Sequence, residues 1–344
     1  MKALMKTDKN IHGQLCLREV PEPSLTDDHS VKIKVHSAGI CGTDVKILNG
    51  EHWCNAPVIL GHEFSGVVTD IGDKVINVKI GDRVVAETGK QICGNCFYCN
   101  TNKSLMCDQR LSIGYGVDGA FAEYLVMRDT IVHKIPENIS LEEAALCEPT
   151  ANAVHACCDR TSVKPGDFVV VIGPGPIGLL CAQVAKALGA QVIIVGIDQD
   201  TSRLELAKRI GIDGVNSQKQ DLPELVKTLS EGKGCDIVIE ASGAKSVVST
   251  AMDIVRKGGT IVQVGLIDGK PEFDYSWLAL REITITGSFG HNWICWERAL
   301  KLMSLNRINI KDMISDQFSL ADWEKAFEIA SSSRGMKVLF HPGK

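Results

Sequence analysis

The feature that most constrains the fold is a glycine-rich segment that directly follows a short apolar run. Residues 168–172 read FVVVI, and residues 173–178 read GPGPIG, which matches the pattern G-x-G-x-x-G. An apolar β-branched run of this length predicts a strand that is buried on both faces. A helical pattern follows and stops at Gly189, the residue type that commonly ends a helix. A strand, a glycine turn and a helix in this order predict a dinucleotide site on a parallel sheet.

The glycine motif supplies the first candidate cofactor residues. They are Gly173, Gly175, Pro176, Ile177 and Gly178. Glycines let the backbone approach a pyrophosphate at the helix N-terminus. Asp198 ends the next apolar run and is expected to accept from a ribose 2′-hydroxyl. Its carboxylate would repel the 2′-phosphate of NADP, so the sequence favours NAD. Arg203, five residues later, would instead attract that phosphate and favour NADP. The alternative is a cluster of turn glycines with an unrelated aspartate.

Two regions of the chain follow different patterns. After about residue 165, apolar runs alternate with helical patterns as far as residue 264, which predicts a doubly wound parallel sheet. Before residue 150, short alternating runs near residues 31–35, 64–70, 83–87 and 122–126 predict a β-barrel or sandwich. The tail predicts helices near residues 294–305 and 321–330 and a strand at residues 337–340.

The chain has 13 cysteines in 344 residues, an odd number that disfavours a secreted disulfide framework. Cys93, Cys96, Cys99 and Cys107 lie within 15 residues and are spaced to close a tetrahedral zinc site. Four thiolates leave no position for substrate, so this zinc is expected to be structural. The alternatives are reduced surface cysteines, a disulfide pair, or a nucleic-acid-binding zinc ribbon. The net charge of −5 disfavours nucleic acid as a partner.

A second metal site is predicted from dispersed residues. Cys41, His62, Glu63 and Glu148 offer a thiolate, an imidazole and two carboxylates, which suit a catalytic zinc with one open position. Such a zinc polarises an alcohol and lowers its pKa. Each residue alone is more commonly structural, and the prediction rests on their combination.

Together these segments resemble the zinc-dependent medium-chain alcohol and polyol dehydrogenase family. The resemblance covers essentially the whole chain. It is carried by CGTD at residues 41–44, GHEFSG at 61–66, GDRV at 81–84, the four-cysteine segment, GAFAEY at 119–124, EP at 148–149, the glycine motif and KVLF at 337–340. The EP pair is similar to sorbitol and iditol dehydrogenases, whereas NAVH at residues 152–155 is similar to L-threonine 3-dehydrogenases.

The resemblance implies a GroES-like β-barrel catalytic domain over residues 1–152, to which residues 291–344 return, and an inserted Rossmann NAD-binding domain over residues 153–290. It implies that Cys41 and His62 bind the catalytic zinc and that Glu63 and Glu148 bind it directly, through water or by exchange. Thr43 takes the proton from the substrate hydroxyl. Further contacts with the dinucleotide are implied for Val264, Gly265, Leu266, Ser288 and Phe289.

One position departs from both branches of the family. Many members have a histidine five residues after the first cysteine, and this chain has Lys46 there. We therefore hypothesise that Lys46 attracts an acidic or phosphorylated polyol. The alternative is a solvated lysine without a role in the reaction.

The expected function is therefore hydride transfer between NAD and a secondary alcohol, with one catalytic and one structural zinc. The substrate is expected to be a polyol or sugar alcohol. One alternative is an L-threonine 3-dehydrogenase, and another is a non-enzymatic dinucleotide-binding protein. We expect a small-molecule substrate, no nucleic-acid or membrane partner, and a homodimer or homotetramer as in relatives. No apolar run reaches the 18 residues of a membrane span, and the expected location is the cytoplasm.

Overall fold

The structure is a computed structural model that describes residues 1–8, 15–101, 103–332 and 335–344. It divides into two compact units. Unit 1 comprises Met1–Glu148, Asn292–Ser304 and Ile314–Lys344, and unit 2 comprises Pro149–His291 and Leu305–Met313. The chain therefore leaves unit 1 within helix α4 (Cys147–Val154) and returns to it twice.

Strand β3 (Ser30–Gly39) is the centre of the larger sheet of unit 1. It pairs antiparallel with β5, β7 and β16, so three other parts of the chain meet on it. Val31, Ile33 and Val35 are buried, and the lysines between them are not, as the predicted alternation requires. The seven strands are β3, β5 (Glu63–Ile71), β6 (Arg83–Ala86), β7 (Tyr124–Arg128), β8 (Val132–Lys134), β15 (Ile314–Phe318) and β16 (Lys337–Phe340).

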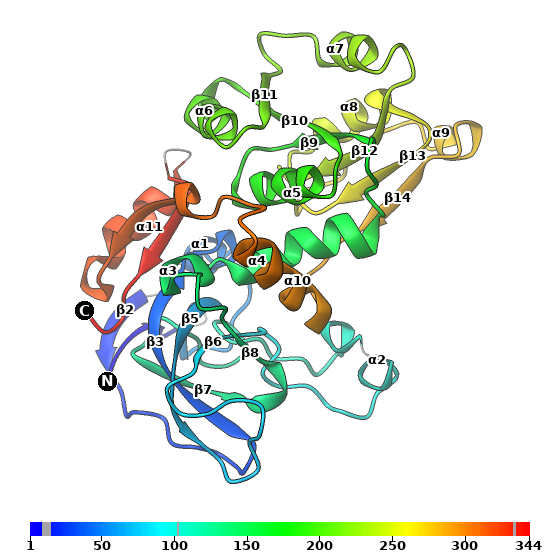
Figure 1. Cartoon of the computed structure of the whole chain (residues 1–344). Helices are drawn as coiled ribbons and strands as arrows, with labels where there is room; N and C mark the ends of the chain where they lie inside the picture. The colour runs from blue at the N-terminus through cyan, green and yellow to red at the C-terminus, as the bar shows by residue number, and fades with distance from the viewer. Residues whose placement is uncertain (9–14, 102, 333–334) are drawn as a thin grey trace. The chain divides into compact units, whose positions relative to one another are not determined.

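A smaller sheet of unit 1 shares its core with the larger one. It contains β1 (Lys2–Lys6), β2 (Leu15–Glu19) and β4 (Val58–Ile59). Leu4, Phe64, Phe121 and Phe340 are buried in this common core, and the rings of Phe121 and Phe340 are 5.0 Å apart. The C-terminal strand β16 and helix α11 lie beside N-terminal strands (Figure 1). The helices are α1 (Gly42–Leu48), α2 (Phe97–Asn100), α3 (Leu141–Ala144), α10 (Trp293–Ser304) and α11 (Trp323–Ser331), with 3-10 turns η1 (Ser104–Met106), η2 (Asp129–Ile131) and η6 (Leu320–Asp322).

Unit 2 is built on one parallel sheet of six strands in the order β11-β10-β9-β12-β13-β14 (Figure 1). From β9 the chain adds β10 and β11 on one side, and it then adds β12, β13 and β14 on the other side. The order of strands thus reverses between β9 and β12, where sheets of this kind bind ligands. The strands are β9 (Phe168–Ile172), β10 (Gln191–Gly196), β11 (Asp213–Asn216), β12 (Cys235–Glu240), β13 (Val255–Gln263) and β14 (Thr284–Gly287).

Helices connect the strands of unit 2. Helix α5 (Pro176–Ala187) begins inside the glycine motif, and Gly189 follows it with a φ of 96°. That left-handed conformation favours glycine and ends the helix where the sequence predicts. The remaining helices are α6 (Thr201–Arg209), α7 (Leu222–Leu229), α8 (Val247–Ile254) and α9 (Ser276–Leu280), with the π-helix η3 (His155–Arg160) and the 3-10 turns η4 (Asp198–Asp200) and η5 (Lys311–Met313).

The predicted fold class, a β domain with a doubly wound parallel-sheet domain, is confirmed. Some element limits differ. Strand β7 begins two residues later than the run at 122–126 predicts, and β13 begins at Val255, five residues before the strand-like run at 260–264 that predicts it. The predicted domain limits stay a prediction. The compact units differ from them at residues 149–152, 291 and 305–313, which all belong to unit 2.

The C-terminal strand should contribute to the stability of unit 1 through Phe340. Replacing this fully buried ring with alanine is expected to cost about 3–5 kcal/mol of unfolding free energy, because it leaves a cavity beside Phe121. Chemical denaturation measures the change. Phe97, which is 72% exposed, is the matched control, and its replacement should change stability by less than about 0.5 kcal/mol. Equal losses in the two variants would contradict this view of the core.

Candidate active site

The first cluster of possible metal donors lies in unit 1, where β3 and β5 pair. Cys41 is the N-cap residue of α1, two residues after β3 ends, and Glu63 begins β5. The antiparallel register pairs Gly39 with Glu63, so the chain segments beyond these two strand ends lie close together. One donor atom from each of Cys41, His62 and Glu63 lies within 4.8 Å of the others. A sulfur, a nitrogen and an oxygen donor suit a catalytic zinc, so these three residues fit the predicted metal.

Asp44 ties the two ligand-bearing segments together, a role that the sequence did not reveal. Its buried carboxylate accepts the N–H of Cys41 at 2.9 Å and the N–H of Gly61 at 3.3 Å, and it lies 3.7 Å from Nδ1 of His62. That buried Nδ1 makes no hydrogen bond to any described residue. Burial alone would lower the pKa of His62, but Asp44 and then Cys41 outweigh it, and the pKa lies well above its usual value. Carboxylates placed in this way orient metal ligands. The available signal was the fourth position of the CGTD motif.

Glu63 is held by a buried cation, Lys337 of strand β16. The Lys337 Nζ donates to the two carboxylate oxygens of Glu63 at 2.7 and 2.8 Å and to the carbonyl of Ile40 at 3.3 Å. Burial alone would lower the pKa of Lys337, but the charge of Glu63 outweighs it, and the pKa is raised. A Cβ at Gly39 would overlap Oε2 of Glu63, so glycine there leaves room for the carboxylate in its pairing with Lys337. Glu63 therefore lies in the donor cluster with its negative charge balanced by Lys337.

Glu148 lies outside this donor cluster. It is buried near the start of α4, within unit 1. Burial and Asp44 affect the pKa of His62 more strongly, and Glu148 raises it further. The carboxylate is thus close enough to act electrostatically. Among the residues that the structure describes, however, it is not one of the donors within 4.8 Å of each other.

Thr43 and Lys46 follow Cys41 on helix α1, and both are partly exposed. Residues three apart lie on the same side of a helix, so both side chains project from one face. Lys46 is in the last turn, next to the loop toward Trp53. The structure therefore places both predicted residues on the helix that begins at the donor cluster.

Three aromatic side chains border the metal donors, and no motif pointed to them as a group. The ring of Tyr115 meets that of His62 edge-on, with centroids 6.1 Å apart. The rings of Trp53 and His52 lie 5.5 and 5.4 Å from Tyr115. Arg110 donates to the hydroxyl of Tyr115 at 3.3 Å. Trp53 is 54% exposed, so an aromatic surface is open to solvent next to the donor cluster.

The four-cysteine segment forms a second cluster in unit 1, with all four sulfurs within 4.8 Å of one another. The N–H of Cys96 donates to the sulfur of Cys93 at 3.3 Å, and that of Cys93 donates to the sulfur of Cys107 at 3.5 Å. Backbone N–H groups of Asn95 and Cys96 lower the pKa of Cys93 to about 6. Burial and the neighbouring sulfurs raise the pKa of Cys99 to about 12. Such crowded sulfurs need a cation to be thiolates together, so the donor set fits zinc.

The predicted dinucleotide residues of the glycine motif and of the loops after β13 and β14 gather at the carboxyl edge of the unit 2 sheet. Ile172, Glu240 and Gln263 are in register on three adjacent strands, so the chain leaves the sheet at one level after each of them. Gly287 pairs with Gln263 and ends β14 at the same level. The predicted residues that follow these strand ends are Gly173, Gly175, Pro176, Ile177, Gly178, Val264, Gly265, Leu266, Ser288 and Phe289.

A side chain would have a different effect at each of the three glycines of the motif. Gly173 has a φ of 101°, and a Cβ there would lie 2.7 Å from the nitrogen of Ser242. A Cβ at Gly178 would lie 1.9 Å from the carbonyl oxygen of Gly173, so this glycine lets helix and turn pack closely. A Cβ at Gly175 would meet nothing within 4 Å. The middle glycine thus leaves open space at the start of α5, as a bound pyrophosphate requires.

Asp198 follows β10 and is exposed. Its carboxylate accepts from Asn216 at 2.8 Å and lies 3.3 Å from Nζ of Lys219, and these two contacts lower its pKa. Arg203 lies 3.9 Å from the carboxylate of Asp200, on the following helix. The accessible groups after β10 therefore include an ionised carboxylate, an acceptor for a hydroxyl, with the exposed Lys219 beside it.

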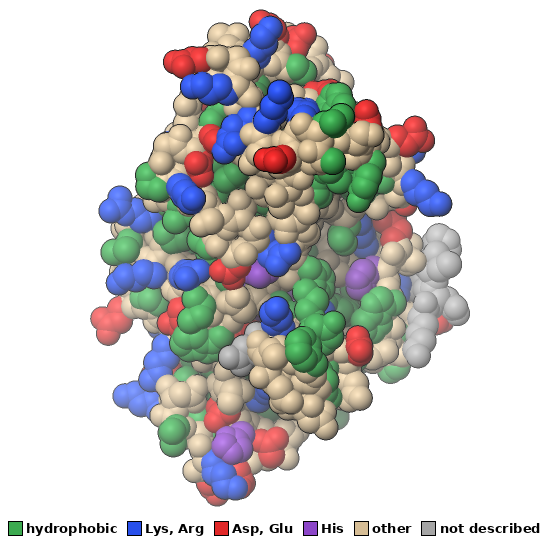
Figure 2. Space-filling view, turned by 90° about the vertical axis from the view of Figure 1, so that its right-hand side faces the viewer, with side chains coloured by type: hydrophobic (Ala, Val, Ile, Leu, Met, Phe, Trp, Pro, Cys, Tyr) green, Lys and Arg blue, Asp and Glu red, His purple; other side chains and the backbone are tan. Residues whose placement is uncertain are grey.

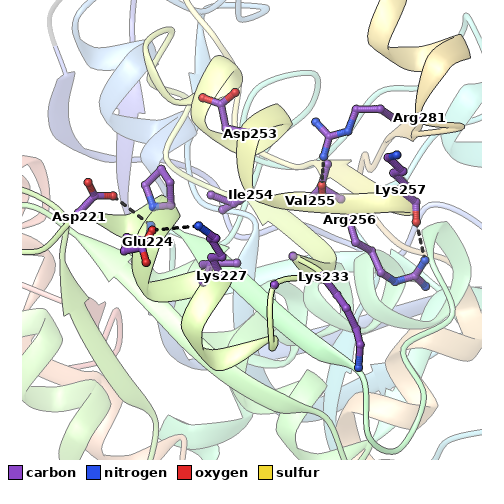
Figure 3. Close-up of a pocket in the computed structure, with 14 residues that line it drawn as sticks. Asp221, Glu224, Lys227, Lys233, Asp253, Ile254, Val255, Arg256, Lys257 and Arg281 are labelled. Atoms are coloured by element: carbon purple, nitrogen blue, oxygen red, sulfur yellow. Dashed lines mark hydrogen bonds and ion pairs between the residues drawn. The ribbon is translucent and has the colours of Figure 1, made fainter.

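A cavity of about 730 Å³ in unit 2 contains none of these residues (Figure 3). It is lined at the amino ends of β12 and β13, the edge opposite the glycine motif. Arg256 donates to Asp236 at 2.6 Å and to the carbonyl of Lys257 at 2.8 Å, and Arg281 donates to two backbone carbonyls. These cations stabilise the fold locally, so we do not place the reaction there.

On the face drawn in Figure 2, acidic and basic side chains are interspersed rather than gathered by sign.

Comparisons with known proteins agree with this arrangement. A family model described as zinc-binding dehydrogenase matches residues 176–305, and one described as alcohol dehydrogenase GroES-like domain matches residues 27–137. The chain is 41% identical to a sorbitol dehydrogenase of Halalkalibacterium halodurans, over 99% of both chains. It is 38% identical to an L-threonine 3-dehydrogenase of Bacillus subtilis, also over 99% of both. Its fold matches galactitol-1-phosphate dehydrogenase from Escherichia coli with a TM-score of 0.90 at 27% identity, covering 99% of this chain and 100% of that one.

Removing Lys337 should destabilise unit 1 through the charge it leaves behind. Lys337→Met buries the Glu63 carboxylate without its cation, which is expected to cost about 3–5 kcal/mol in urea unfolding of the metal-free protein. Lys134→Met is the matched control, because Lys134 pairs with Asp82 at 2.8 Å but is 54% exposed. Its loss should cost less than about 1 kcal/mol. If both variants unfold like wild type, the buried pair does not stabilise the fold.

The four-cysteine segment should bind one metal ion that contributes to folding. Cys96→Ala is expected to reduce the zinc content from two ions to one per chain and to lower the melting temperature, because structural zinc binding adds to the folding free energy. Cys16→Ala is the control, since Cys16 is outside both donor clusters. Elemental analysis and calorimetry measure both effects. Unchanged zinc content and melting temperature in Cys96→Ala would contradict the assignment.

Proposed function

The chain belongs to the zinc-binding alcohol dehydrogenase family, and from this premise we propose that it transfers a hydride between NAD and a secondary hydroxyl of a polyol. The observation that carries the proposal is the set of donors at Cys41, His62 and Glu63, which suits a catalytic zinc. The open glycine turn at Gly175 and the carboxylate of Asp198 support a dinucleotide as the hydride carrier.

The chain's own residues divide the reaction between them. Cys41 and His62 would hold the catalytic zinc, and Glu63 and Glu148 would balance its charge or bind it directly. When bound, the metal supplies Lewis acidity toward the substrate oxygen, and NAD accepts the hydride at its nicotinamide ring. Thr43 is proposed to accept the hydroxyl proton and to release its own proton toward solvent. Cys93, Cys96, Cys99 and Cys107 would hold a second, structural zinc.

A polyol suits the surface next to these donors. The aromatic faces of Trp53 and Tyr115 offer contact to the C–H side of an extended carbon chain. Lys46 on α1 offers a cation to an acidic or phosphorylated end of the substrate. The similarity to sorbitol dehydrogenase supports the polyol, and the similarity to L-threonine 3-dehydrogenase supports a second candidate substrate, L-threonine.

The cofactor is proposed to be NAD rather than NADP. The carboxylate of Asp198 is ionised and exposed at the end of β10, where a 2′-phosphate would be repelled. Arg203, which the sequence analysis named as a residue that would attract a 2′-phosphate, lies near the carboxylate of Asp200. A non-enzymatic dinucleotide-binding protein would need no Cys41, His62 and Glu63 cluster, so we favour the enzyme.

A homodimer or homotetramer and a cytoplasmic location stay predictions. Strand β14 is one of the two outer strands of the unit 2 sheet, and a second copy is proposed to extend the sheet at this strand. In the parts of the chain that the structure describes, no helix is both long and apolar enough to cross a lipid bilayer.

A substrate panel tests the proposal. NADH absorbance is recorded with sorbitol, iditol, galactitol, galactitol 1-phosphate and L-threonine, with NADP in parallel. We expect turnover of at least one polyol with NAD, and its loss in Cys41→Ala, which lacks a metal ligand but should keep its fold by circular dichroism. Turnover of L-threonine alone would favour the second candidate. Wild-type activity in zinc-free Cys41→Ala would overturn the mechanism.

The panel also tests Lys46. If it binds an anionic end, Lys46→Ala should lower kcat/KM for galactitol 1-phosphate by about tenfold and leave that for galactitol unchanged. Lys34→Ala is the control for a general change in charge, because Lys34 is an exposed residue of β3. Equal effects on both substrates would refute the proposed role of Lys46.

A further inference from the structure

Glu240 is a fully buried carboxylate at the point where the order of strands reverses in unit 2. It ends β12, opposite Ile172 of β9 on one side and Gln263 of β13 on the other. Burying a carboxylate is costly unless it is hydrogen-bonded or paired. None of the sequence motifs includes Glu240. Its contacts in the structure must therefore explain why a carboxylate is buried there.

The carboxylate accepts hydrogen bonds from the loop after β12 and from the last residue of β13. One oxygen accepts the N–H of Ser242 at 2.8 Å, the N–H of Gly243 at 3.0 Å and the hydroxyl of Ser242. The other oxygen accepts from the side-chain amide of Gln263 at 2.5 Å. That amide also donates to the carbonyl of Gly265 at 2.7 Å. Glu240 thus joins the loop after β12 to the loop after β13 through neutral donors.

These loops pack closely against one another and against the glycine motif. A Cβ at Gly265 would lie 2.4 Å from the nitrogen of Gly243 and 2.6 Å from the carboxylate of Glu240. A Cβ at Gly173 would meet the backbone of Ser242 at 2.7 Å. The Glu240 carboxylate therefore holds Ser242, which packs against the first turn of the proposed dinucleotide site, and lies beside Gly265, a predicted contact residue after β13.

We propose that Glu240 is a positioning residue for the dinucleotide and fixes the loops that bind its nicotinamide half. The inference rests on the proposed function. The glycine motif after β9 would take the pyrophosphate and Asp198 after β10 the adenosine ribose, so the loops after β12 and β13, across the reversal point, face the other half. A carboxylate suits this role because both of its oxygens accept hydrogen bonds. In a glutamine, the NH2 group would replace one oxygen and would face N–H donors that it cannot bind.

The test measures binding without turnover. Glu240→Gln is titrated with NADH by fluorescence and with 5′-AMP by calorimetry, and wild type is titrated in parallel. We expect the Kd for NADH to rise by about tenfold, the effect of one unsatisfied buried hydrogen-bonding group, and the Kd for AMP to stay within about twofold. AMP occupies only the adenosine half, so a general loosening of the sheet would weaken both ligands.

Asp236→Asn is the matched control on the same strand. Asp236 accepts the N–H of Phe168 at 2.8 Å and pairs with Arg256 at 2.6 Å, but it lies at the opposite edge of the sheet. Its replacement should lower the melting temperature without changing NADH binding. Gln263→Met provides a second route if Glu240→Gln does not fold, because it removes the donor shared by Glu240 and Gly265, and NADH binding should again weaken selectively.

Hydrogen exchange of the cofactor-free protein adds a direct readout, with faster exchange expected in Glu240→Gln for the N–H groups of Ser242 and Gly243. Unchanged NADH binding in a folded Glu240→Gln protein would overturn the inference alone. An equal loss in Asp236→Asn, or an equal loss for AMP, would also overturn it. A wild-type protein that binds neither NADH nor NADPH would overturn the proposed function as well.

Discussion

The register of β3 against β5 is the constraint on which the metal donors depend. It pairs Gly39 with Glu63, so the strand that leads to Cys41 ends beside the strand that begins after His62. On the other side of β3, Leu339 pairs with Gly39 and brings Lys337 toward Glu63. Since a slip by one residue exchanges the faces of a strand, each of these contacts requires this one register.

In unit 2, the register of parallel strands likewise brings distant residues together. In a parallel sheet the carboxyl ends of the strands lie at one edge, so residues far apart in sequence leave the sheet together. Ile172, Glu240 and Gln263 are such residues. The buried carboxylate between the other two then connects the loop after β12 with the end of β13 through hydrogen bonds.

The sequence predicted what depends on neighbours along the chain. The four cysteines lie within 15 residues, and the glycine motif adjoins its strand and helix, so spacing alone carried the information. It did not reveal Lys337, because its partner Glu63 is 274 residues away and a lysine in a strand is ordinarily exposed. Glu240 was missed for a similar reason, since its partner Gln263 lies on a different strand, 23 residues away. The inclusion of residues 305–313 in unit 2 also depends on packing, because Gln183 of α5 binds the backbone of Asn309.

The buried charges of unit 1 argue for a cation at Cys41 and His62 independently of any family. Asp44, Glu63 and Glu148 are buried carboxylates whose charges all act on His62 or on one another, and Lys337 is the cation that pairs with Glu63. With Cys41 as a thiolate and His62 as the neutral imidazole that can bind a metal, four negative charges face the one positive charge of Lys337. Burial raises the pKa of Asp44, the cost of holding a carboxylate there. A divalent cation would reduce the excess from three charges to one. Unit 2 holds Glu240 instead with donors that, among the described residues, are all neutral, which suits a group that fixes loops.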